Sequence, residues 1–413
     1  MARARSPLVI IFITVFIDLV GFGIVIPVLP LYAERFRASP VVIGLLVSVF
    51  SAMQFIFAPI LGRLSDRVGR RPVLLVSLIG TAAGFLIMGL AGSLWLLFLA
   101  RIVDGITGGN ISIAQAYIAD VTPPDQRSRG MGMIGAAFGL GFIFGPAIAG
   151  VMSHISPGAP FLFAAGLSAA NAVALYFLLP ESLSAEHRVE AARRSSILSV
   201  LQKSGSWQLG GVMATYFFAT LAFALLTMVY SLFTNKRFGL DATHNGYVFA
   251  YLGVLGAAIQ GGLLGRLLKV ASEKSLAVVG IAVLAASMLA LPISTGIAVL
   301  IVVSSGVAIG NSFATPTLNG LASKSVGPAL QGQVLGTLQS SASLARILGP
   351  LIGGWLLDYD LNNHTTRYGR TPFWAGGAIM IIALLIALTL QPARAPEEES
   401  GQEQPSGSAS QPS

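Results

Sequence analysis

The sequence predicts an all-α polytopic membrane protein whose twelve transmembrane helices form two six-helix pseudo-repeats. Three observations predict this fold class: the composition, the spacing of the apolar segments and a repeat between the two halves. Of the 413 residues, 54% are hydrophobic and only 10% are charged, whereas soluble domains carry about 25% charged residues. The composition therefore excludes a soluble globular protein, a disordered chain and a coiled coil.

Apolar segments of roughly 20 residues, the length needed to cross a bilayer, recur along the chain. The predicted spans are 8–32, 41–62, 72–91, 94–119, 130–152, 159–180, 207–234, 245–267, 275–294, 296–321, 332–357 and 371–391. A polar stretch divides them six and six, so we expect an N-terminal half (1–181), a cytoplasmic linker (182–206) and a C-terminal half (207–391). Residues 392–413 have the composition of a disordered cytoplasmic tail.

The distribution of basic residues predicts the orientation in the membrane. With the N-terminus inside, 17 of the 25 Lys and Arg residues lie on the inner side and six on the outer side. Because basic residues accumulate on the cytoplasmic side, we expect both termini in the cytoplasm and the chain in the cell (inner) membrane. The same rule accounts for the net charge of +8, so no nucleic-acid partner is expected. The first apolar segment is too long for a signal-peptide core and should remain as a helix.

Three short motifs repeat at offsets of 201–204 residues, each on the corresponding helix of its half. The pairs are Gly62-Arg-Leu64 with Gly265-Arg-Leu267, Gly109-Asn110 with Gly310-Asn311, and Gly145-Pro146 with Gly349-Pro350. Six-helix halves in parallel repeat are typical of transporters in which one half rocks against the other.

Four longer motifs carry a resemblance to a known family. They are Gly62-Arg-Leu-Ser-Asp66-Arg67-Val-Gly69-Arg70-Arg71-Pro72 in the second loop, Arg101-Ile-Val-Asp104-Gly105 in helix four, Gly139-Leu-Gly141-Phe-Ile-Phe-Gly145-Pro146 in helix five and Asp18-Leu-Val-Gly21 in helix one. The loop resembles the signature of the major facilitator superfamily. Helices one and five are similar to those of the bacterial tetracycline/multidrug proton antiporters. The resemblance covers residues 8–391 and implies a proton-coupled secondary active transporter that exports drug-like or amphiphilic small molecules by alternating access.

The resemblance also implies a gate on the inner side. Asp66 would dock at the N-terminal end of helix eleven, near Gln331 and Gly332, where free N–H groups favour a carboxylate, and Arg67 and Arg70 would meet Asp120. The alternative is that the arginines only fix the topology. The Gly-Pro pairs would form a tight contact between helices, or serve plain packing. The expected gating residues are Gly62, Asp66, Arg67, Gly69, Arg70, Arg71, Asp120, Gly145, Pro146, Gly349 and Pro350.

Charged residues within the membrane are costly, and they mark proton or substrate pathways or pair with each other. Asp18 stands in the middle of helix one with no cation nearby in the sequence, so it could exchange a proton or bind a cationic substrate. Arg101 and Asp104 share a face of helix four. They could form a self-satisfied ion pair, or Arg101 could reach helix one and favour the ionised form of Asp18 or Asp104. We assign proton coupling to Asp18, Arg101 and Asp104.

Isolated polar residues within apolar helices are the candidates for the substrate cavity. For each, a hydrogen bond between helices is the alternative to ligand contact, and Arg346 could instead extend toward the inner surface. The candidates are Gln54, Asn110, Gln115, Tyr230, Gln260, Asn311, Asn319, Gln339 and Arg346.

The sequence departs from the tetracycline antiporters at two acidic positions that the resemblance implies. Gly84 stands in helix three, and helix nine reads Val283-Leu-Ala-Ala286. A cavity without these acids favours apolar, weakly charged molecules over tetracycline. The alternative function is a proton-coupled or passive carrier of a metabolite in the same fold.

An enzyme is not expected. The four histidines fall in loops, cysteine is absent, and the sequence lacks HExxH, GxSxG and Walker motifs. We therefore expect no metal site and no cofactor, with energy taken from a gradient. The expected partners are a small-molecule substrate, protons and the lipid bilayer, and the protein is expected to act as a monomer.

Overall fold

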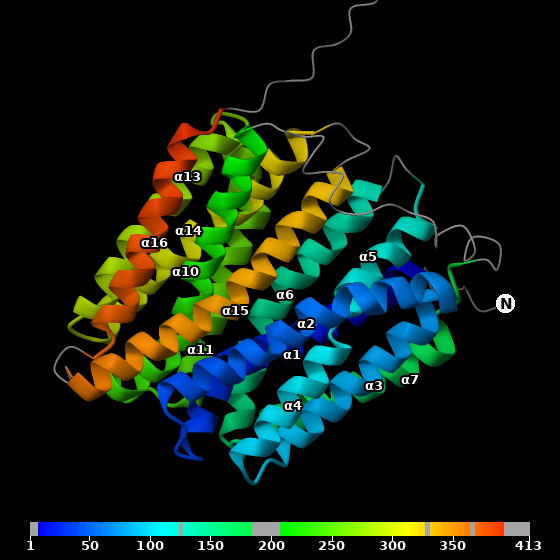
Figure 1. Ribbon diagram of the computed structural model, residues 1–413, viewed down its shortest axis with the longest axis horizontal. Helices are drawn as coiled ribbons and strands as arrows, with labels where there is room; N and C mark the ends of the chain where they lie inside the picture. Colours follow the sequence, from blue (N-terminus) through cyan, green and yellow to red (C-terminus); the bar gives the residue numbers. More distant parts are fainter. Residues whose placement is uncertain (1–6, 124–126, 184–206, 327–330, 364–367, 392–413) are drawn as a thin grey trace, which may run out of the picture.

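The computed structural model describes residues 7–123, 127–183, 207–326, 331–363 and 368–391. Over these ranges the chain folds into long helices packed side by side (Figure 1). The predicted linker, beyond Leu183, and the predicted tail lie outside the described residues.

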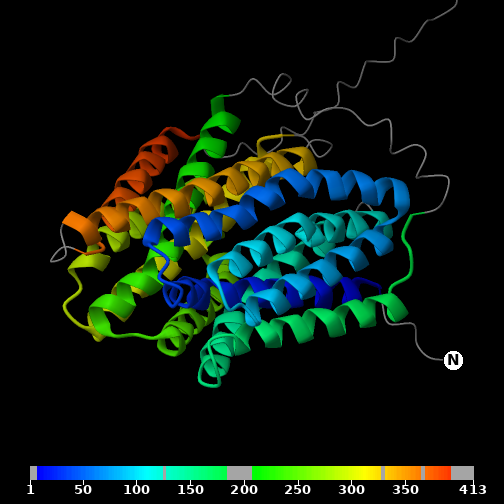
Figure 2. The same ribbon diagram turned by 60° about the horizontal axis from the view of Figure 1, so that its bottom comes forward.

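Seven helices make up the first half. They are α1 (Pro7–Glu34), α2 (Pro40–Val68), α3 (Arg70–Gly89), α4 (Leu94–Thr107), α5 (Asn110–Val121), α6 (Arg127–Ser153) and α7 (Ala159–Leu178). Helix α1 is mostly buried and packs on α6 and α7. Figure 2 shows it in dark blue, running between α2 and α7.

The second half repeats this pattern. It contains α10 (Trp207–Phe238), α11 (Ala242–Ala258), the π-helix η3 (Ile259–Leu263), α12 (Leu264–Leu267), α13 (Glu273–Ala290), the 3-10 turn η4 (Leu291–Ile293), α14 (Ile297–Lys324), α15 (Gln331–Asn363) and α16 (Arg370–Thr389). Helix α10 takes the inner position, between α15 and α16.

The helices confirm the predicted class of an all-α polytopic membrane protein. Among the described residues, eleven helical segments are long and apolar enough to cross a membrane, and they coincide with eleven of the predicted spans. The remaining predicted span, 332–357, lies in α15, which has 33 residues, is more polar, and packs against α2 and α10.

The bundle has two ends, which we name by the turns that mark them. The Asp66 end is where α2 ends and α3 begins, and the Arg35 end is where α1 ends and α2 begins. Gly69 makes the reversal between α2 and α3 with φ 123°, a conformation that a side chain would strain. Side chains of Ser39, Asp241 and Ser272 cap α2, α11 and α13 by accepting a hydrogen bond from a backbone N–H group three residues on.

The predicted fourth span is confirmed as a membrane span, and the structure adds a break within it that its apolar length did not reveal. Helix α4 ends at Thr107 and α5 begins at Asn110. The break falls where α2 packs closely against it. A Cβ on Gly108 would lie 3.1 Å from Nε2 of Gln54, and one on Gly109 would lie 2.8 Å from Cδ1 of Leu61. Two glycines therefore allow both the break and the close approach.

In each Gly-Pro pair, the glycine packs against the inner helix of its own half, which is α1 in the first half and α10 in the second. A Cβ on Gly145 of α6 would lie 2.6 Å from the carbonyl oxygen of Val20 in α1. Similarly, a Cβ on Gly349 of α15 would lie 2.7 Å from the carbonyl oxygen of Leu221 in α10. Each glycine thus lets two backbones touch, as small residues do between membrane helices.

The carbonyl of the following proline faces the other half. A Cβ on Gly246 of α11 would lie 2.7 Å from the Pro146 oxygen, and one on Gly44 of α2 would clash with the Pro350 oxygen. The two halves are therefore joined by two equivalent seams, α6 with α11 and α15 with α2. In Figure 1, α2 and α15 run side by side across the bundle.

Both seams open toward the Asp66 end. A Cβ on Gly62 of α2, Gly135 of α6, Gly261 of η3 or Gly336 of α15 would meet no atom within 4 Å. By contrast, Ser48 Oγ donates to the Ile347 oxygen (2.7 Å) in the closed part of the α2–α15 seam. The close backbone contacts described between the halves therefore lie away from the Asp66 end, and these four glycines border open space.

The start of α16 offers a test of the packing. Asp360 is fully buried and accepts hydrogen bonds from the N–H (3.1 Å) and the Oγ1 hydroxyl of Thr371. We expect Asp360→Ala to lower the midpoint of thermal unfolding in detergent, because the stranded partners cost about 1–3 kcal/mol. Asp358→Ala is the matched control, since Asp358 accepts an exposed hydrogen bond from Asn362. Equal midpoints for the two variants would contradict this account.

Candidate functional site

A cluster of polar side chains lies inside the first half, midway along α1. Asn110, the first residue of α5, donates from Nδ2 to Oδ1 of Asp18 (2.6 Å) and lies 3.5 Å from Oγ1 of Thr81 in α3. Thr81 also hydrogen bonds Asp104 of α4, which is within electrostatic reach of Asp18. Asn110, Thr81 and Asp104 are buried, and Asp18 is partly exposed. The helix break thus brings a neutral amide to the carboxylate.

Arg101 and Asp104 form a buried ion pair. The distance from Nη1 to Oδ2 is 3.3 Å, and the two side chains are 2% and 8% exposed. The expectation that Arg101 reaches helix one is wrong. Its guanidinium lies 4.1 Å from the ring centroid of Phe50 in α2. The aromatic face gives the buried cation a second favourable contact besides Asp104. Removing either charge would leave the other unpaired, a cost of about 3–5 kcal/mol.

Two carboxyl groups and one arginine give this cluster a choice of charge states. With both carboxyl groups ionised it carries one net negative charge, and one bound proton makes it neutral. A buried environment penalises an unbalanced net charge. Because Asp18 and Asp104 interact, the proton belongs to the pair. The chemistry to which these side chains are suited is reversible proton uptake.

The second half contains a polar cluster around Arg346 of α15. Arg346 donates from Nη2 to Oγ of Ser343 (3.1 Å) and is electrostatically coupled to Tyr216 of α10. The Tyr216 hydroxyl is hydrogen bonded to Asn319 of α14. Two predicted cavity residues, Arg346 and Asn319, are thus brought together, with the partly exposed Arg346 as the charged group.

The remaining cavity candidates are more scattered. Tyr230 is a correction: it is 2% exposed and hydrogen bonds Ser304 of α14 (2.8 Å), so it joins helices inside the second half. Asn311 accepts from Thr315 of its own helix (3.1 Å). Gln115 is half-buried on α5, whereas Gln260 and Gln339 are exposed. Gln54 donates to the Gly108 oxygen (2.9 Å), at the helix break.

The predicted gating residues at the Asp66 end form a network within the first half. Arg70 is 2.5 Å from Asp66 and, through Nε, 3.0 Å from Oδ2 of Asp120. Arg67 is exposed, which corrects the expectation that it meets Asp120. Arg71 turns the other way and donates to the Tyr176 oxygen of α7. The expected dock for Asp66 is the start of α15, where the side chain of Gln331 lies outside the described part of the structure.

Sequence reasoning missed Glu181, which completes this network. Its carboxylate accepts from the backbone N–H groups of Arg70 (2.9 Å) and Arg71 (3.2 Å) at the start of α3. Beside it, Ser182 donates to Oδ2 of Asp120 (3.0 Å). Glu181 directly follows the last predicted span of the first half. Nothing in the local sequence indicates that this acid caps α3, a helix that begins about 110 residues earlier.

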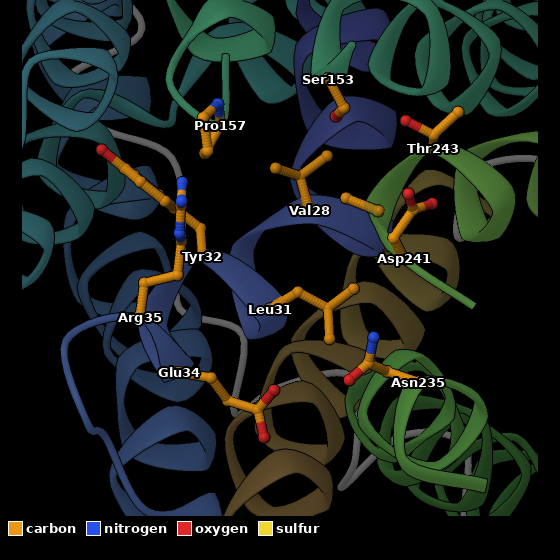
Figure 3. A pocket seen from close by; sticks show the side chains of 11 residues that line it. Val28, Leu31, Tyr32, Glu34, Arg35, Ser153, Pro157, Asn235, Asp241 and Thr243 are labelled. Atoms are coloured by element: carbon orange, nitrogen blue, oxygen red, sulfur yellow. The ribbon is translucent and has the colours of Figure 1, made fainter. Parts of the chain in front are cut away.

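A cavity of about 410 Å³ lies between the halves at the Arg35 end (Figure 3). Its lining includes Leu31 and Glu34 of α1, Asn235 of α10 and Asp241 before α11. Although partial burial opposes ionisation, hydrogen bonds from His244 hold the pKa of Asp241 below its usual range. The cavity is thus bordered by charged groups, and the predicted site residues lie elsewhere.

Known proteins resemble this chain over almost its whole length. Residues 11–350 match the sequence profile of the Major Facilitator Superfamily. The tetracycline resistance protein, class H, of Pasteurella multocida is 34% identical over 390 residues, which cover 92% of this chain and 95% of that protein.

Two solved structures share the fold. The human organic anion transporter MFSD10 (TETRAN) superposes with a TM-score of 0.69 at 25% identity, covering 94% of this chain and all of that one. A bacterial homologue of the human lysosomal transporter Spinster, in an inward-facing and unoccupied conformation, gives 0.79 at 15% identity, covering 94% and 97%. With a family profile matched over most of the chain and a relative aligned nearly end to end, this protein belongs to the Major Facilitator Superfamily and is a membrane transporter.

Proposed function

We propose that the protein is a proton-coupled exporter of drug-like or amphiphilic small molecules that works by alternating access. The observation that carries this proposal is the cluster around Asp18, with its 2.6 Å hydrogen bond to Asn110 and the Arg101–Asp104 pair beside it. A membrane carboxyl with a neutral partner can bind and release a proton without breaking an ion pair. Export is further supported by the resemblance of helices one and five to drug/proton antiporters and by the tetracycline resistance relative.

We infer that the Asp66 end is cytoplasmic and that the described conformation is open to the cytoplasm. The orientation rests on the 17 basic residues counted on that side. The open side rests on the glycines without neighbours at the Asp66 end and the closed seams at the Arg35 end. Both termini would then be cytoplasmic, with the chain in the inner membrane and active as a monomer of two halves, 1–181 and 207–391.

Transport then consists of two exchanges at opposite ends. In the described state, substrate enters from the cytoplasm between the halves, near Arg346 and the Asp18 cluster. Rocking closes the Asp66 end, brings Asp66 to the N-terminal end of α15 and opens the seams at the Arg35 end. There the substrate leaves and a proton neutralises the cluster, which favours the return.

A carrier of organic anions or metabolites is the second candidate. It is favoured by Arg346, a partly exposed cation in the second half, and by the organic anion transporter that shares the fold. Uptake of a compound panel into reconstituted vesicles, with and without an imposed pH gradient, separates the candidates. Accumulation of lipophilic drugs against their gradient supports export, and selective movement of anions supports the alternative.

The first functional prediction concerns Asp18. We expect Asp18→Asn to abolish substrate accumulation driven by a pH gradient in vesicles, because the amide keeps the shape but cannot titrate. Downhill transport should persist in part. Asn171→Leu is the control, since it removes another polar contact to α1, the 3.3 Å contact with Thr14. If Asp18→Asn still transports substrate uphill at the parent level, the proton-coupling role belongs to Asp104 instead.

A second prediction concerns the gate. Asp66→Asn should insert normally but lower the transport rate roughly tenfold or more, because loss of a charge-assisted contact of about 1.5–3 kcal/mol weakens the outward-open state. Arg63→Gln, at an exposed residue of the same helix end, should transport at the parent rate. If Asp66→Asn transports as fast as the parent, the loop only fixes topology.

The third prediction concerns selectivity. A Cβ on Gly84 would lie 2.9 Å from Cβ of Asp104, so α3 has no room there for an acidic side chain. With Val283–Ala286 also apolar, we expect cells expressing the protein to resist several lipophilic drugs modestly and tetracycline little. Susceptibility assays against both classes check this. Strong protection against tetracycline alone would refute the proposed selectivity.

A further inference from the structure

We propose that Asn110 and Gln54 are a positioning pair that transmits the protonation state of Asp18 to α2 through the break between α4 and α5. This inference rests on the proposed proton coupling at Asp18. It assigns a role to two amides for which ligand contact and helix packing are the alternatives.

The Asn110 side chain can satisfy either state of Asp18. With an ionised carboxylate, Nδ2 donates to Oδ1 across 2.6 Å, as in the described structure. The Oδ1 atom of Asn110 is buried and has no hydrogen-bond partner within the described part of the chain. A protonated Asp18 has an O–H to donate, so rotation of the amide would supply that missing partner. A carboxamide offers both donor and acceptor, and a hydrocarbon side chain offers neither.

Among the described residues, the charged group within electrostatic reach of Asp18 is Asp104 of α4, which is itself paired with Arg101. The other helices packed against this part of α1 present neutral groups: Thr81 of α3, Gly141 of α6 and Asn171 of α7. Of the groups around Asp18, the amide of Asn110 is therefore the hydrogen-bonded partner whose role can change, from donor to acceptor, when Asp18 takes up a proton.

A movement of Asn110 can be passed to α2 because a residue only two positions earlier, Gly108, is hydrogen bonded to that helix. Asn110 starts α5, and the preceding break leaves the Gly108 oxygen outside a continuous helix. Gln54 of α2 donates to that oxygen (2.9 Å). Leu61 of α2 also lies against the break, 2.8 Å from where a Cβ on Gly109 would stand. The break is therefore fastened to α2, and a shift of Asn110 displaces the group that Gln54 holds.

Helix α2 is suited to receive this displacement. Its Gly44 packs on the Pro350 oxygen of the other half at the Arg35 end, and its Asp66 lies at the other end beside Arg70. Movement of α2 thus alters the seam and the gate together. This gives a continuous chain of contacts from Asp18 to the interface between the halves.

Distance measurements between spin labels test the inference directly. The chain contains no cysteine, so labels can be placed at Arg63→Cys of α2 and Ser340→Cys of α15, both exposed near the Asp66 end. In reconstituted vesicles of the parent we expect the separation to change with pH around a single midpoint. Asn110→Leu and Gln54→Leu should remove that change, or move its midpoint by about one pH unit, the equivalent of a roughly tenfold change in proton affinity. In both variants, substrate accumulation driven by a pH gradient should fall roughly tenfold, in line with the change in proton affinity.

Matched variants separate the inference from the proposed function. Asn171→Leu, which loses a buried contact to the same helix, should keep the parent midpoint. If Asp18→Asn keeps the pH-dependent change, proton coupling at Asp18 fails. If Asp18→Asn loses the change while Asn110→Leu and Gln54→Leu keep the parent midpoint, the positioning pair is overturned and the coupling stands. Gln54 lies on α2, away from the charged cluster. The midpoint of Gln54→Leu therefore tests the positioning pair even if Asn110→Leu does not fold.

Discussion

The contact between a proline carbonyl and a facing glycine is the interaction on which the architecture depends. In a bilayer, burial of apolar surface does not drive helices together, so association relies on close packing and polar contacts. The Pro146 oxygen faces Gly246, and the Pro350 oxygen faces Gly44. Because the same contact is made twice, the two halves meet along two equivalent seams. Neither partner contributes a side chain to this contact, so the contact itself can separate without displacing a packed side chain.

The same helices connect the seams to the charged cluster. Gly145 immediately precedes Pro146 and packs on α1, the helix that carries Asp18. On the other side, α2 carries Phe50 against Arg101 and Gln54 against the helix break. The buried charges therefore lie between α6 and α2, the two helices of the first half that form the seams. Desolvation makes a change of charge at this point energetically large, which suits a position next to the moving interface.

Much of the fold follows from the sequence because membrane helices are encoded by local apolar length. The predicted span ends agree with the helix ends to within about six residues, and the spacing of Arg101 and Asp104 was enough to predict that they share a helix face. What the sequence could not reveal depends on contacts between distant helices. The break before Asn110 requires the approach of α2, Tyr230 is buried by Ser304, and Glu181 acts on a helix far back in the chain. Arg67 and Arg70 differ by less than one helical turn, and only the packed loop determines that Arg70 reaches Asp120.

The network at the Asp66 end has a consequence for biogenesis. Its members, from Asp66 and Arg70 to Asp120, Glu181 and Ser182, lie in the first half or at the first residue of the predicted linker. Chains emerge from the ribosome N-terminus first, and their domains generally fold as units. The first half can therefore complete its own ion pairs and helix caps while Gly246 and Gly349 are still untranslated. Assembly of the protein is then ordered in time, with the seams between the halves formed last.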